Sequence, residues 1–184
     1  MSSTRFHHLG CAVFLLCMAG CSPRFNWREV APPSTPLRAS MPCKPEIAAR
    51  TVPLDGGPVE MHLAGCDAGG ATFVIGWAPV PAPRLGAVLG AWQDSTLQLA
   101  GIPAGPDAPA GRGFVPAGGA ALPQSVRLAA TGRAPDGTPL PLQAAWFAAV
   151  GTEAGGAQAL FAAVYRTPEA ADASETFFSG LRLR

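Results

Sequence analysis

The sequence predicts an α+β fold in which an antiparallel sheet of about six to seven strands carries two helices on one face. Three observations lead to this class. Short β-prone segments separated by turn residues come in two groups. A segment with apolar residues at helical spacing follows each group. The connections inside each group are short, as in hairpins, and hairpins build antiparallel sheets.

The first twenty residues have the three parts of a secretory signal. Residues 1–9 carry one arginine and no acid, residues 10–18 are apolar, and Ala19-Gly20 precede Cys21. The apolar core is about half of the ~20 residues that a transmembrane helix needs. We therefore expect residues 1–20 to be removed on export.

The run Met18-Ala19-Gly20-Cys21 resembles the lipobox of bacterial lipoproteins, although Met18 stands where that family usually has leucine. The resemblance implies cleavage between Gly20 and Cys21 and a diacylglycerol on the Cys21 sulfur, which would anchor the chain in a membrane. Two acyl chains hold a protein firmly, whereas one holds it only marginally. By resemblance to the sorting rules of Gram-negative lipoproteins, Ser22 in place of aspartate implies the outer membrane rather than the inner one, with the protein facing the periplasm. The alternative is an ordinary cleaved signal with an incidental cysteine.

Residues 21–36 are predicted to form a lipidated N-terminus and a tether, because Pro32, Pro33 and Pro36 favour extended backbone. Two aromatic residues in this segment, Phe25 and Trp27, are expected to dock on the domain that follows. Residues 37–184 are long enough for a single domain.

The first group of strands is predicted at residues 37–41, 47–53, 59–66 and 71–78. The turn-rich segment 54–57 makes a hairpin of the second and third strands. Pairing Pro53 with Pro58 in this hairpin places Cys43 and Cys66 almost opposite each other. Because Cys11 and Cys17 leave with the signal and Cys21 carries lipid, these two cysteines are left to form a disulfide in an oxidising compartment. Two buried free thiols are the alternative.

Residues 85–99 are predicted to form the first helix, since Leu85, Val88 and Trp92 recur at helical spacing and Gly101 can end it. Residues 102–124 then contain five prolines and five glycines, which predicts a long irregular loop. A passive loop is favoured over a recognition lid. Phe114 and Val115 are candidates for holding it to the surface.

The second group consists of three predicted strands at residues 125–131, 142–150 and 157–166. Thr167 and Pro168 then favour the start of a second helix, with threonine as cap and proline in the first turn. Phe177, Phe178 and Leu181 lie on one side of this helix.

No catalytic or metal-binding constellation emerges from the sequence. Once residues 1–20 are removed, His62 is the only histidine, so a histidine-based metal site cannot form. No serine lies in a G-x-S-x-G context, and no Gly-Gly pair has the lysine of a phosphate-binding loop. Twelve basic and twelve acidic residues remain after the signal, which leaves no basic stripe for nucleic acid. We expect no catalytic residue, no metal and no cofactor.

Four segments resemble a group of uncharacterised lipoproteins from Gram-negative proteobacteria: Asn26–Val30, Met41–Pro45, Gly65–Phe73 and Phe177–Arg182. The resemblance implies a location and a topology but no activity. The layout is also remotely similar to PsbP-like and Mog1-like α+β domains, which mostly act as accessory or partner-binding modules. Fold alone does not decide function.

The sequence therefore favours a non-enzymatic envelope lipoprotein that binds a protein partner or supports an assembly at the membrane. The alternative is a periplasmic carrier or sensor of a small apolar ligand held between sheet and helices. Trp77, Trp92 and Trp146 are the candidate residues for that ligand site, although ordinary core packing is the favoured explanation for them.

Overall fold

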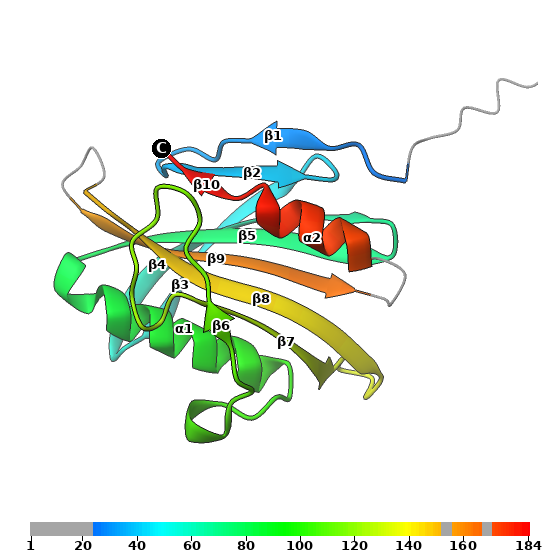
Figure 1. Ribbon diagram of the computed structural model, residues 1–184. Coiled ribbons are helices and arrows are strands. Elements are labelled where there is room, and N and C mark those ends of the chain that lie inside the picture. Colours follow the sequence, from blue (N-terminus) through cyan, green and yellow to red (C-terminus); the bar gives the residue numbers. More distant parts are fainter. Residues whose placement is uncertain (1–23, 152–155, 167–170) are drawn as a thin grey trace, which may run out of the picture.

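The computed structural model describes residues 24–151, 156–166 and 171–184 (Figure 1). The expected signal, the cleavage site at Gly20 and Cys21, and the helix start at Thr167-Pro168 lie outside the described residues. The predictions for them stay predictions.

Seven antiparallel strands form the main sheet, which confirms the α+β class. Their order across the sheet is β3-β4-β5-β9-β8-β7-β6. The strands are β3 (Glu46–Leu54), β4 (Gly57–Ala68), β5 (Ala71–Val80), β6 (Arg112–Gly113), β7 (Val126–Arg133), β8 (Pro139–Val150) and β9 (Ala157–Arg166). Strands β5 and β9 join the two sequence groups at the centre, where ten residue pairs face each other from Ala71↔Arg166 to Val80↔Ala157.

The two helices cover opposite faces of this sheet, which differs from the expectation of one shared face (Figure 1). Helix α1 (Leu85–Leu99) packs in one core cluster, and helix α2 (Ala171–Ser179) packs in the other. The reason lies in the central strands. On β8, Trp146 is buried toward α1 while its neighbour Phe147 is buried toward α2. Because β8 and β9 are apolar on both faces, each face needs a cover.

A second sheet of three strands lies with α2 on the same face (Figure 1). It consists of β1 (Arg28–Val30), β2 (Leu37–Met41) and β10 (Arg182–Leu183), with β2 in the middle. Strand β1 falls inside the segment expected to be a tether, where it pairs with β2. Phe25 and Trp27 contact Phe73 edge-on, so both aromatics dock on the domain as expected.

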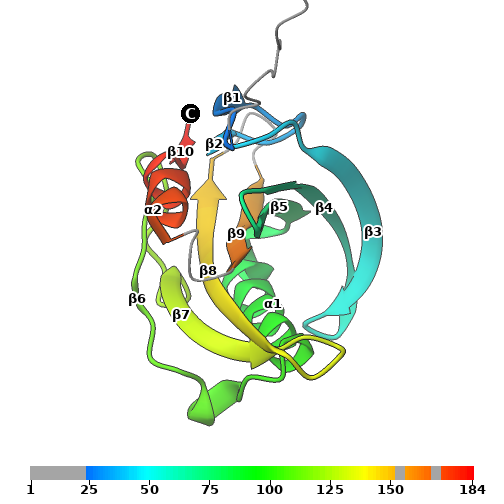
Figure 2. The same ribbon diagram turned by 90° about the vertical axis from the view of Figure 1, so that its right-hand side faces the viewer.

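The main sheet curves around α1, so that the helix lies on its concave side (Figure 2). The helix ends as the sequence predicts. Gly101 has a positive φ of 65°, and the Ile102 N–H donates to the Leu97 carbonyl at 2.9 Å. Glycine tolerates this left-handed conformation, which satisfies carbonyls at the end of the helix.

The segment 102–124 is more ordered than a structureless loop. It contains a short 3-10 turn, η2 (Gly105–Asp107), and strand β6, which covers the outer edge of β7. Phe114 contacts Phe147 and Phe178, whereas Val115 stays exposed. The prediction that Phe114 and Val115 hold this segment to the surface is confirmed for Phe114 alone.

Candidate functional site

Cys43 and Cys66 form the predicted disulfide, with their Cα atoms 6.0 Å apart. The β3–β4 hairpin has the expected register, in which Pro53 faces Pro58. Cys43 lies in the bend between β2 and β3, and that bend carries it to Cys66 on β4. The disulfide indicates an extracytoplasmic location, because such bonds form and persist in oxidising compartments.

The three candidate tryptophans do not line one common site. Trp77 is buried in the cluster on the α2 face, whereas Trp92 and Trp146 belong to the cluster on the α1 face. His62 stacks on Trp77 with ring centroids 5.2 Å apart, and its Nε2 lies 3.5 Å from Glu60 Oε1. Within the described part of the chain, no group of three or more His, Cys, Asp or Glu residues could hold a metal ion.

A cavity of about 500 Å³ lies between α1 and the end of the curved sheet that carries β3. Its walls come from β3, β4, β5, α1, β8 and β9, with Arg133 and Pro135 closing the side near the β7–β8 turn. Most of the lining is apolar, and Trp92 of α1 stacks on Phe161 of β9 with centroids 5.3 Å apart. The sequence indicates Trp92 as a candidate ligand contact, but it carries no pattern that would identify the residues of the other walls.

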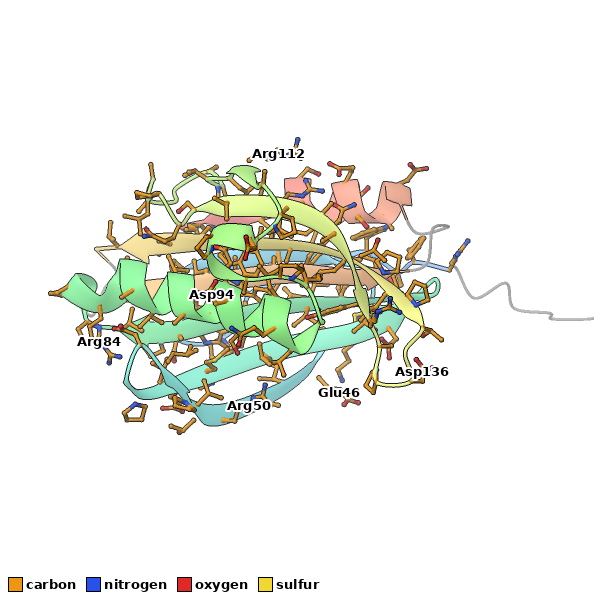
Figure 3. The ribbon with its side chains drawn as sticks, turned by 90° about the horizontal axis from the view of Figure 1, so that it is seen from below. Glu46, Arg50, Arg84, Asp94, Arg112 and Asp136 are labelled. Carbon is orange, nitrogen blue, oxygen red and sulfur yellow. A yellow bond between two sulfur atoms is a disulfide. The ribbon has the colours of Figure 1, made fainter. Side chains whose placement is uncertain are left out.

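The hairpin that forms one wall is held against the start of α1 by Arg84, which Figure 3 labels with Arg50 and Glu46 of β3. The Arg84 guanidinium donates to Asp55 Oδ2 at 3.2 Å and to the Leu54 carbonyl at 3.0 Å. These bonds tie the tip of the β3–β4 hairpin to the start of α1.

Five polar side chains line this otherwise apolar cavity: Ser95 and Thr96 of α1, and Arg50, Arg133 and Tyr165. The Arg50 side chain makes no hydrogen bond or ion pair with any residue that the structure describes. The Arg133 guanidinium donates a single long hydrogen bond of 3.4 Å, to the Gly137 carbonyl. Burial raises the pKa of the Tyr165 phenol, so its hydroxyl stays protonated and can donate. Among the described residues that line the cavity, none is acidic.

Arg127 of β7, a buried arginine outside the cavity, links β7 and β8 to α2. The Arg127 guanidinium is 7 % exposed, and its Nη2 lies 2.5 Å from both Glu175 Oε1 and Gln143 Oε1. It also lies over the Phe178 ring, 3.9 Å from the centroid. Because its charge is already compensated, we assign Arg127 a structural role. The sequence gave no sign of this contact, since Arg127 and Glu175 are 48 residues apart.

Strand β3 is an edge strand of the main sheet, and its outer side has no strand partner among the described residues. Loop 102–124 covers the β7 side of the sheet through β6, whereas β3 has a partner on one side only, β4. Seven of its nine residues are exposed, all except Val52 and Leu54, and Ile47 exposes 54 % of its surface. Such an edge offers unpaired backbone groups to another strand.

No family model, curated protein or solved structure matches this chain. The resemblances drawn from the sequence therefore stay predictions. None of the helices in the described ranges is long and apolar enough to cross a membrane.

Proposed function

We propose that this protein is a lipid-anchored envelope module, non-enzymatic, that binds an envelope protein partner along the free edge of β3. The anchor is the diacylglycerol on Cys21, in the outer membrane and facing the periplasm. The Cys43–Cys66 disulfide supports the extracytoplasmic part of this proposal. The anchor itself rests on the lipobox-like Met18–Cys21.

The observation that carries the partner role is the exposed β3 strand itself. An extended segment that adds to a sheet edge gains main-chain hydrogen bonds, and its side chains supply specificity. Glu46 and Arg50 lie on the same face of β3, since they are four residues apart, and neither forms an ion pair with a described residue. Charges on an edge discourage unspecific pairing, so a partner strand needs a base opposite Glu46 and an acid opposite Arg50.

Site-specific photo-crosslinking in intact cells tests the partner role. A crosslinker at Thr51 or Ala49 of β3 is expected to capture one discrete partner, and Glu46→Arg is expected to reduce that capture. The matched control is a crosslinker at Leu99, which is 79 % exposed on α1. Equal capture from β3 and Leu99, or capture that ignores the charge at position 46, would contradict the proposal.

The cavity beside Trp92 favours a second function, the carriage or sensing of a small apolar ligand. A volume of about 500 Å³ lies within the range of ~300–1,000 Å³ that is typical of ligand pockets. Native mass spectrometry of protein extracted from the envelope would test this role by detecting a retained small molecule. A cavity-filling Val74→Phe variant is expected to lose it.

A further inference from the structure

We infer that the cavity under α1 takes a single-chain anionic amphiphile of the fatty-acid class. The inference rests on the carrier function proposed above and adds the chemistry of its ligand. Three features carry it: an apolar interior, an uncompensated pair of arginines and an apolar residue exposed on the helix beside them.

The interior suits an alkyl chain. Trp92, Phe161 and residues of β3, β4 and β5 supply apolar walls, and they do so from the concave side of the sheet. Each methylene that leaves water contributes about 0.8 kcal/mol. Thr96, a polar residue of the lining, donates its hydroxyl to the Trp92 carbonyl at 2.8 Å. Its donor is therefore used within the helix and does not require a polar ligand.

The charge of the lining selects an anionic head group. Arg50 comes from β3 and Arg133 from the end of β7, so the two guanidinium groups belong to different walls of the cavity. The nearest acid in sequence to Arg133 is Asp136, and the Thr138 N–H and hydroxyl both donate to its carboxylate. Asp94 of α1 accepts the Gly105 N–H at 3.1 Å. Asp136 thus accepts within its own turn and Asp94 accepts from the segment after α1, and neither forms an ion pair with Arg50 or Arg133. Both arginines therefore keep donors for a carboxylate.

Tyr165 adds a neutral donor. It lines the same cavity from β9, and no described residue forms a hydrogen bond with its hydroxyl. Leu99, at the C-terminal end of α1, also lines the cavity and is 79 % exposed. An exposed leucine beside two arginines is the composition expected where an amphiphile enters, with its chain inward and its head at the cationic rim.

Isothermal titration calorimetry with two chain-matched probes tests the inference. The full chain carrying Cys21→Ser is titrated with dodecanoate, below its micelle concentration, and with dodecanol. Dodecanoate is expected to bind more tightly than dodecanol. The double variant Arg50→Gln/Arg133→Gln is expected to weaken dodecanoate binding about tenfold and to leave dodecanol binding unchanged. Arg112→Gln, which removes an exposed arginine outside this cavity, is the matched control and should change neither.

The outcomes separate the two proposals. If dodecanol binds as tightly as dodecanoate, or if the double variant binds dodecanoate as the parent does, the anionic class is overturned while a carrier of apolar ligands stands. If neither probe binds, or if Val74→Phe leaves both affinities unchanged, the carrier function itself is overturned.

Discussion

Removing the Cys43–Cys66 disulfide is expected to destabilise the protein by about 3 kcal/mol, and the separation of the two cysteines gives this magnitude. They are 23 residues apart in sequence. In the chain-entropy model, a crosslink that closes a loop of this size lowers the entropy of the unfolded chain by an amount equivalent to about 3 kcal/mol at 25 °C. For a domain of this length, that corresponds to a fall in Tm of about 6 to 12 °C.

The variant to compare is Cys43→Ala/Cys66→Ala, because it removes both thiols and leaves no unpaired cysteine in the hairpin. The assay is guanidinium unfolding followed by tryptophan fluorescence, with and without reductant. Reductant should lower the unfolding free energy of the parent to that of the variant and should not affect the variant. A difference below about 1 kcal/mol between the oxidised parent and the variant would refute the reasoning.

Three further predictions follow from the described contacts. Glu175→Ala should lower the free energy of unfolding by about 1–3 kcal/mol, because it leaves the buried Arg127 guanidinium with less charge compensation. Arg127→Met, which removes the buried charge itself, should lower it by less. Thermal unfolding of both variants checks this order, and a reversed order would contradict the prediction. If the β3 partner is a second copy paired antiparallel in the register centred on Ala48, Glu46 lies opposite Arg50, so either charge reversal alone should weaken dimers in sedimentation and the double reversal should restore them. Restoration that fails points to a different partner protein. Tyr165 is the only tyrosine in the chain, so the phenolate absorbance reports on it alone, and burial should make it titrate above pH 10.0. The free energy of unfolding should fall as the pH rises from 10.0 through the raised pKa of Tyr165 in the folded protein. A titration at or below pH 10.0 would contradict burial as the cause of the shift.

Local signals in the sequence predicted the parts of the fold that depend on neighbouring residues. The turn between β3 and β4 determines the register that opposes Pro53 and Pro58, and this register brings the cysteines together. The helix over 85–99 also follows from local spacing and from Gly101, and its observed bounds are Leu85–Leu99. Both features are decided within a few residues along the chain.

The parts that sequence analysis missed depend on contacts between distant segments. In strand β8 the adjacent Trp146 and Phe147 are flanked by alanines on both sides, so both faces of the strand are apolar. The periodicity of the sequence therefore does not say which helix covers which face of the sheet. The cavity depends on how strongly the sheet curves around α1, and its arginines come from strands that are not adjacent in sequence. Single-sequence patterns carry no information about such curvature.

The contacts of Arg24 and Phe25 with the domain limit how far the domain could lie from a membrane that holds Cys21. Arg24 donates to the Gly69 carbonyl at 2.8 Å, so the chain is already fastened to the domain three residues after Cys21. Three residues span at most about 11 Å, so the connection between the lipidated residue and the domain would be short. If Cys21 carries the lipid, the β4–β5 turn to which Arg24 binds stays within about that distance of the lipidated residue, and the domain has little freedom to move away from the bilayer.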